Sequence, residues 1–129
     1  MANLGVDFGS SFTTVSWINP LNGKPEAVKF NGDGSVKLPS AILSSNFGLV
    51  FGFQAQGYLE DVYKSPIENR LELLSCFIPS LKRILNAAMT ETLRNKDYSH
   101  EELLTLFFKH MLEMASAHCG HNTHFDSVT

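Results

Sequence analysis

The chain has 129 residues, a hydrophobic content of 43% and a formal net charge of -3 at pH 7. This length suffices for one domain with a sizeable core, and this composition is typical of globular rather than disordered chains. Lysine and arginine form no cluster, which argues against nucleic acid as a partner. No apolar run approaches the roughly 18 residues of a membrane helix, and the first residues lack the basic and apolar regions of a signal peptide. We therefore expect a cytoplasmic protein that binds neither nucleic acid nor membranes.

The first half of the chain predicts short strands. Apolar, β-favouring runs bounded by turn residues predict them at 3–8, 12–18, 26–30, 41–44 and 49–52. The small residues Gly9, Ser10 and Ser11 separate the first two runs and predict a hairpin turn. The chain is therefore expected to open as a three-strand meander.

The second half predicts helices. Strand alternation is lost after Gly52, and the pattern and the prolines predict helices at 54–63, 68–77 and 82–85. Residues 86–98 are polar and give no clear assignment. A new apolar run at 125–129 predicts the start of a further strand.

The clearest helix is predicted between Ser99 and Gly120. Ser99 and Glu102 form a capping box, and Gly120 is a natural end. Its apolar residues recur at spacings of three and four: Leu103, Leu104, Phe107, Phe108, Met111, Leu112 and Ala115. A groove for a partner is one interpretation of this stripe, but an apolar face at helical spacing is usually core, and we expect core here.

The turn after the first strand carries the clearest chemical signal. An apolar strand delivers Asp7 into a turn of Gly9, Ser10 and Ser11. Small side chains let backbone N–H groups approach phosphate oxygens, and an aspartate beside them can hold a hydrated magnesium ion. The pattern is not a Walker A loop, because no GxxxxGK[ST] occurs and no helix follows. An ordinary hairpin turn is the alternative.

The segment Gly5-Val6-Asp7-Phe8-Gly9-Ser10-Ser11 resembles the first phosphate motif of the superfamily of actin, sugar kinases and heat-shock chaperones. In the DnaK branch, also called the heat-shock 70 family, this motif usually reads G-I-D-L-G-T-T. Four further segments resemble that branch in the same order: 32–43, 51–55, 80–85 and 98–103. The resemblance spans the whole chain, although only the first motif is specific by itself. Serines replace the usual threonines, and the lengths of 52–82 and 86–97 depart from the family, so the chain resembles a divergent branch.

The resemblance implies a site for ATP and Mg²⁺. Gly9, Ser10, Ser11 and Phe12 would bind the phosphates, largely through backbone amides. Asp7 would hold magnesium through its water shell. Lys82 would reach the transferred phosphate and position the attacking water, and its assignment as catalytic rests on the match of residues 82–85. A solvated helix lysine is the alternative for Lys82.

The resemblance also implies a fold and a domain organisation. The fold class would be α/β, the incomplete first lobe of an actin-like ATPase with a ribonuclease-H-like core, built as a β-meander plus a small α/β peripheral subdomain. Residues 1–38 would form the first part of the core with the phosphate loop, 39–121 the peripheral subdomain, and 122–129 the start of a truncated core strand.

No second phosphate loop occurs in these residues, so we expect an N-terminal fragment of the nucleotide-binding domain that is inactive alone, whose intact parent hydrolyses ATP. The parent's partners would be nucleotide, unfolded polypeptide and co-chaperones. The fragment itself is expected to self-associate through an open sheet edge. Two alternatives remain: another actin-like ATPase or sugar-kinase relative, and a non-catalytic interaction module of the same fold.

Cysteine and histidine give no convincing metal or disulfide signal. Cys76 and Cys119 lie far apart and outside any CxxC pattern, which favours two reduced thiols. His118, His121 and His124 crowd around Cys119, yet their spacing fits no standard zinc pattern. A frayed, polar helix end is the expected structure there.

Overall fold

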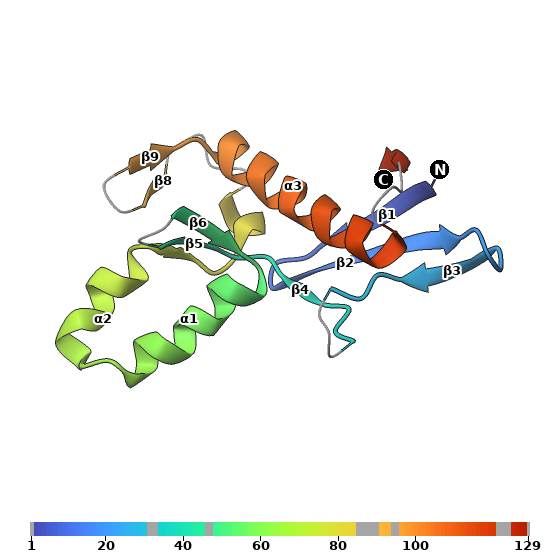
Figure 1. Ribbon diagram of the computed structural model, residues 1–129. Coiled ribbons are helices and arrows are strands. Elements are labelled where there is room, and N and C mark those ends of the chain that lie inside the picture. Colours follow the sequence, from blue (N-terminus) through green and yellow to red (C-terminus); the bar gives the residue numbers. More distant parts are fainter. Residues whose placement is uncertain are drawn as a thin grey trace.

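The computed structural model describes residues 2–30, 34–45, 48–84, 91–93, 96–120 and 125–128. Its elements are β1 Ala2–Phe8, β2 Phe12–Asn19, β3 Lys24–Ala27, β4 Leu38–Pro39, β5 Ile42–Ser45, β6 Gly48–Phe51, α1 Phe53–Lys64, α2 Ile67–Leu74, β7 Phe77–Ile78, the 3-10 helix η1 Leu81–Ile84, β8 Glu91–Leu93, β9 Lys96–Tyr98, α3 His100–Cys119 and β10 Phe125–Val128. The fold is mixed α/β, as the sequence predicts (Figure 1). None of the described helices is both long and apolar enough to cross a membrane.

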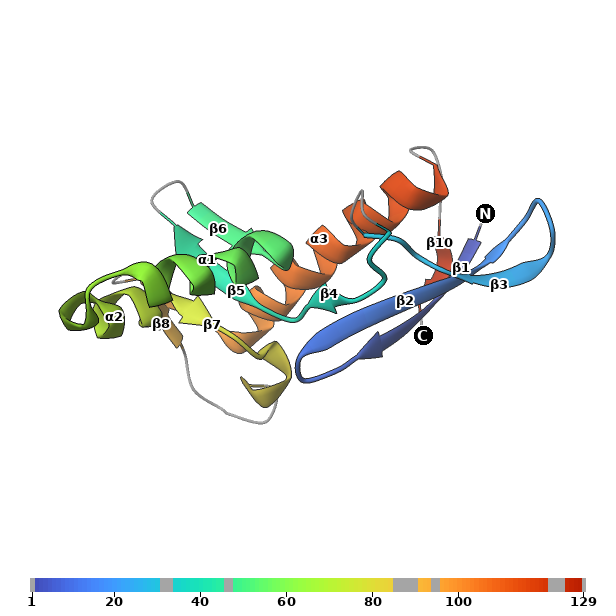
Figure 2. The same ribbon diagram turned by 90° about the horizontal axis from the view of Figure 1, so that it is seen from below.

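The first sheet has the strand order β10-β1-β2-β3, with β4 also paired to β2. The predicted hairpin is confirmed, because β1 and β2 are antiparallel and place Val6 opposite Val15. β10 runs parallel to β1 and starts where the apolar run at 125–129 predicts a strand. Residues from both ends of the chain therefore lie side by side in this sheet (Figure 2).

The third strand is displaced from its predicted position at 26–30. β3 covers Lys24–Ala27 and places Pro25 opposite Ile18. Proline is tolerated there because β3 lies at the edge of the sheet, where a missing N–H costs no ladder hydrogen bond. Val28 and Phe30 are buried beyond the end of the strand. The apolar side chains of Val28 and Phe30 indicate burial in the core, but the sequence analysis took them as evidence for a strand at 26–30.

A second sheet, with the order β6-β5-β7, contains the main error in the predicted helices. The helix predicted at 68–77 ends at Leu74, and Phe77–Ile78 instead form β7, whose residues pair with Leu43 and Ile42 of β5. Both β7 side chains are buried, so tertiary packing overrides the helical pattern. The unassigned region 86–98 contains the β8–β9 hairpin, and the short helix predicted at 82–85 is η1.

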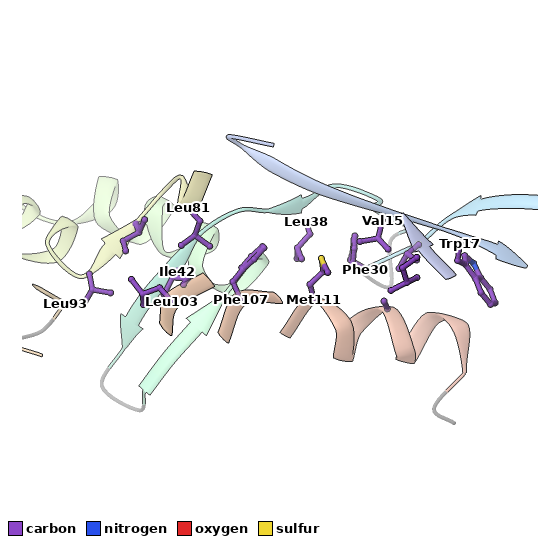
Figure 3. Close-up of a cluster of buried hydrophobic side chains, with 14 residues drawn as sticks. Val15, Trp17, Phe30, Leu38, Ile42, Leu81, Leu93, Leu103, Phe107 and Met111 are labelled. Carbon is purple, nitrogen blue, oxygen red and sulfur yellow. The ribbon is translucent and has the colours of Figure 1, made fainter. Parts of the chain in front are cut away.

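α3 joins the two sheets into one core. The capping box is confirmed, since the Ser99 hydroxyl accepts from the Glu102 N–H and the Glu102 carboxylate accepts from the Ser99 N–H. One cluster of buried side chains runs along the helix and reaches both sheets (Figure 3): Leu4, Val15, Trp17, Val28, Phe30, Leu38, Ile42, Ile78, Leu81, Leu93, Leu103, Phe107, Met111 and Ala115. Complete burial of a leucine or phenylalanine contributes about 1.5–3 kcal/mol. The stripe on α3 is therefore core, as predicted, with Phe107 and Met111 buried and Phe108 packed 5.1 Å from Phe8 between ring centroids.

The end of α3 is tethered to the first sheet, which corrects the expected frayed end at His118. The Nε2 atom of His118 lies 3.0 Å from Oε1 of Glu26, and Nδ1 accepts a long hydrogen bond of 3.4 Å from the Lys29 N–H. If Nδ1 accepts, the proton of the neutral ring lies on Nε2, which donates to the carboxylate. His121 and His124 lie outside the described residues.

Neither cysteine forms a disulfide, as predicted. Cys76 is buried, and Cys119 is partly buried at the end of α3. Burial, with a smaller contribution from the negative charge of Glu26, raises the pKa of the Cys119 thiol to about 11. The thiolate of Cys119 is therefore scarce at neutral pH, and this cysteine is poorly suited to nucleophilic chemistry.

We expect the free energy of unfolding of the Glu26→Gln variant to depend less on pH, in the acid range, than that of the wild type. The hydrogen bond from Asn19, and then that from His118, lower the pKa of Glu26 from its ordinary value of 4.5. A carboxyl group with a depressed folded-state pKa stabilises the fold above pH 4.5 and loses that contribution as the pH falls through the lowered value. Urea unfolding should therefore separate wild type from Glu26→Gln at pH 7 and bring them together in acid. An exposed control, Glu60→Gln, should show no such convergence, and a constant gap between wild type and Glu26→Gln would contradict the assignment.

Candidate functional site

The turn between β1 and β2 is closed by its own backbone. The Gly9 N–H donates to the Phe12 carbonyl at 2.9 Å. A Cβ atom added to Gly9 would lie only 2.5 Å from that same carbonyl oxygen. Position 9 therefore accepts no side chain without movement of the loop backbone. This steric limit explains why the motif has glycine at this position.

Three carbonyl groups of this loop are held by donors from other segments. The Ser40 hydroxyl donates to the Gly9 carbonyl at 3.0 Å, and the Ser40 N–H donates to the Ser11 carbonyl at 3.0 Å. The Ser80 hydroxyl donates to the Ser10 carbonyl at 2.6 Å. Carbonyl oxygens repel anions, and these hydrogen bonds occupy them.

Two amide groups of the loop, those of Ser10 and Ser11, remain available by comparison. Within the ranges that the structure describes, the N–H groups of Ser10 and Ser11 have no hydrogen-bond acceptor. The side chains of both serines are exposed. Successive free amides can bind phosphate oxygens where a turn makes them converge, and small side chains leave room for the anion. The loop can therefore present donors to an anion while its acceptors are occupied.

Ser40 is the buried centre of this support. Its side chain and that of Thr13 are fully buried, with their hydroxyl oxygens 2.9 Å apart. Because the Ser40 proton is given to the Gly9 carbonyl, the Thr13 hydroxyl must be the donor in the pair. A buried chain of hydroxyl groups thus runs from β2 through Ser40 to the loop and fixes its conformation.

Lys82, the lysine assigned from the sequence, follows two residues that are bonded to the loop and to its support. η1 begins directly after Ser80, and the Leu81 N–H donates to the Ser40 carbonyl at 2.9 Å. The chain leading into Lys82 is therefore bonded both to the loop and to the segment that supports it. Lys82 itself is exposed, and no acidic partner for it is found among the described side chains.

A second lysine near the loop was missed by sequence reasoning. The Nζ atom of Lys37 lies 5.7 Å from the centroid of the Phe12 ring, and Phe12 is the last residue of the proposed phosphate loop. Lys37 reaches this place because the next residue, Leu38, pairs with Thr13 in the sheet. Lys37 therefore brings positive charge to the Phe12 end of the loop.

Asp7 lies at the end of β1, opposite Thr14, with its side chain exposed. It borders an open hollow of about 370 Å³ on the sheet face away from α3, lined by Gly5, Val6, Asp7, Thr14, Val15, Ser16 and Ala27. The residues are small, and a Cβ atom on Gly5 would lie 2.9 Å from the Ser16 hydroxyl oxygen. Asp7 is thus free to hold water or a hydrated cation beside the loop.

Sequence reasoning also missed the roles of Thr13, Ser40 and Ser80. Ser40 and Ser80 each fall in segments that resemble the chaperone family, yet their hydroxyl groups were given no function. The available signal was a serine inside an apolar run, because a buried hydroxyl requires a hydrogen-bond partner. The partner itself, a loop carbonyl about 30 or 70 residues away, could not be identified from one sequence.

The fold is mixed α/β, with a turn of small residues after its first strand whose carbonyls at Gly9, Ser10 and Ser11 are hydrogen-bonded. No protein-family model matches the chain. The chain is 29% identical over 117 residues to the chaperone protein DnaK of Metamycoplasma hominis, covering 91% of this chain and 17% of that protein. It is 25% identical over 126 residues to the chaperone protein DnaK of Mycoplasmopsis agalactiae, covering 98% of this chain and 19% of the relative.

These similarities are distant but extend over nearly the whole chain, and they agree with the resemblance of its motifs to DnaK. The chain spans less than a fifth of the length of these relatives. It is therefore similar to one part of a DnaK chaperone.

Proposed function

We propose that these residues are the N-terminal part of the ATP-binding domain of a DnaK-like chaperone, and that the β1–β2 loop binds the phosphates of ATP. The proposal rests mainly on the hydrogen bonding of this loop. Its carbonyls at Gly9, Ser10 and Ser11 are occupied, while the amides of Ser10 and Ser11 are free within the described residues. The distant similarity to DnaK supports the choice of nucleotide over another anion.

The residues present fit the phosphate half of such a site. Ser10 and Ser11 would hold phosphate oxygens through their backbone N–H groups. Gly9 and Phe12, which the sequence also assigns to the phosphates, would shape the loop, since the Gly9 N–H donates to the Phe12 carbonyl. Asp7 would hold Mg²⁺ through its water shell, since a hard cation retains much of its hydration. The bound ion would offset phosphate charge during the reaction.

Lys82 would orient the attacking water and stabilise charge on the transferred phosphate. Its support is the pair of hydrogen bonds from Ser80 and Leu81, which attach the start of η1 to the loop and its serine. Lys37 would add positive charge on the Phe12 side.

The proposal includes the actin-like fold and its division into 1–38, 39–121 and 122–129. The first sheet, with its antiparallel β1, β2 and β3 and parallel β10, supports a ribonuclease-H-like core. The boundary at 38 falls within β4, where the chain passes from the first sheet to the second. The cytoplasmic location, the polypeptide clients, the co-chaperones and self-association of the chain also remain proposals.

The test is ATP hydrolysis by the protein translated from the complete reading frame that encodes these residues. We expect slow, magnesium-dependent turnover, in contrast to no turnover by residues 1–129, which hold one phosphate loop. Phosphate release measured with and without magnesium distinguishes these outcomes. A complete protein that binds ATP without turnover would support a non-catalytic module, and one that does not bind ATP would contradict the proposal.

A further inference from the structure

α2 exposes an apolar stripe that no described part of the chain covers. Ile67, Leu71 and Leu74 are 76%, 83% and 37% exposed, and none of the helix's residues is buried. At about 100° per residue, these three side chains lie within roughly 60° of one another around the helix. Tyr63, at the end of α1, is also 63% exposed. Figures 1 and 2 both place α1 and α2 at the end of the molecule away from β3.

The stripe has an acidic border on one side. Glu68 and Glu72 follow one flank of it and are exposed, and neither has a cationic partner among the described side chains. The flanking cation on the other side, Arg70, is already engaged. Its guanidinium donates to the carbonyls of Tyr63 and Ser65 at 2.9 and 3.3 Å. The free charge that α2 itself carries beside the stripe is therefore negative.

This charge argues against two occupants. If α2 packed antiparallel on a second copy about a two-fold axis, the same flank would meet itself, and Glu68 and Glu72 would approach their own counterparts. Like charges at such spacing are destabilising. An anionic lipid surface would be repelled for the same reason. The complementary occupant carries positive charge beside an apolar face.

We propose that α2 docks an amphipathic helix of another protein, with leucine-type side chains on the stripe and lysine or arginine beside Glu68 and Glu72. Packing of two apolar helix faces supplies affinity, and the acidic flank fixes the partner's orientation. This surface lies apart from the β1–β2 loop, so it does not depend on the proposed ATP site.

The test uses the 129-residue chain and a synthetic helical peptide with leucines on one face, bordered by lysines. A second peptide has glutamate in place of each lysine. Fluorescence anisotropy should give saturable binding of the lysine peptide only. Leu71→Gln should weaken it by about tenfold or more, the size expected for a central apolar contact. The matched control Leu21→Gln, at a leucine that is 93% exposed in the β2–β3 turn, should leave binding unchanged.

Charge reversal provides the second arm. The double variant Glu68→Lys and Glu72→Lys should lose the lysine peptide and gain the glutamate peptide, while Glu101→Lys on α3 should do neither. Circular dichroism verifies that each variant is folded. Equal binding by Leu71→Gln, or equal affinity for both peptides, would overturn the proposal. A wild-type dimer in sedimentation that Leu71→Gln abolishes would overturn it too, because a second copy would then cover the stripe.

Discussion

Replacing Lys82 by alanine in the protein translated from the complete reading frame is expected to lower single-turnover ATP hydrolysis by about 10²- to 10³-fold. This is the typical cost of removing one preorganised group that stabilises transition-state charge, on the order of 3 kcal/mol in the barrier. Lys82 is exposed and contributes little to the core, so the fold and ATP binding should be retained. Rapid-quench measurement of one turnover isolates the chemical step from product release.

Two comparisons make this result specific. Lys64→Ala, at the exposed C-terminal end of α1, removes a lysine distant in sequence and should leave turnover unchanged. Asp7→Asn should also reduce turnover, and the loss should depend on magnesium concentration, because the asparagine would still accept hydrogen bonds but would hold the hydrated ion less well. Unchanged single-turnover hydrolysis in Lys82→Ala would mean that the match across residues 82–85 is wrong.

The Phe107→Ala variant is expected to lose about 3–5 kcal/mol of the free energy of unfolding. Phe107 is fully buried, and its ring centroid lies 6.0 Å from that of Phe8 on β1. It belongs to the cluster that connects α3 to both sheets. Alanine would leave a cavity that packed neighbours fill only in part, and a small domain has only about 5–15 kcal/mol of stability in total.

The neighbouring residue provides the control. Leu106 is 37% exposed on the same helix, and alanine preserves helix propensity. Leu106→Ala should therefore cost much less in urea unfolding than Phe107→Ala. Equal losses for the two variants would contradict the assignment of the α3 stripe to the core.

The sequence predicted those parts of the fold whose signals are local. The capping box at Ser99 and Glu102, and the apolar spacing after it, are confirmed as α3. The small-residue turn at 9–11 is confirmed as the link between two paired strands. In each case the residues that carry the signal also make the contacts that stabilise the element.

The errors arose where a distant partner decides the structure. Phe77 falls within the helix predicted at 68–77, yet it belongs to β7, and the backbones of Phe77 and Ile78 pair with β5. Pro25 argues against a strand, yet it lies at a sheet edge where no donor is needed. Both outcomes depend on segments that the local pattern does not contain.

The candidate site shows the same division. The roles of Gly9, Ser10 and Ser11 as a phosphate loop were proposed from the sequence and remain to be tested. The hydrogen bonds by which Ser40 and Ser80 hold this loop could be identified only from the structure. The same is true of the position of Lys37 beside Phe12. Hydrogen bonds that join residues so far apart in the chain leave no periodic trace in one sequence.

The most direct test of the phosphate loop is an NMR titration of the ¹⁵N-labelled 129-residue chain with Mg²⁺ and ATP. We expect the amide signals of Gly9, Ser10, Ser11 and Phe12 to shift most, with millimolar affinity, because these residues hold only one phosphate loop. Adenosine should leave these signals in place. Gly9→Ala, whose Cβ atom collides with the Phe12 carbonyl, should abolish the shifts, and Gly57→Ala, whose Cβ atom meets nothing within 4 Å, should keep them. Loop amides that do not respond to ATP, or that respond equally to adenosine, would contradict a phosphate-binding loop.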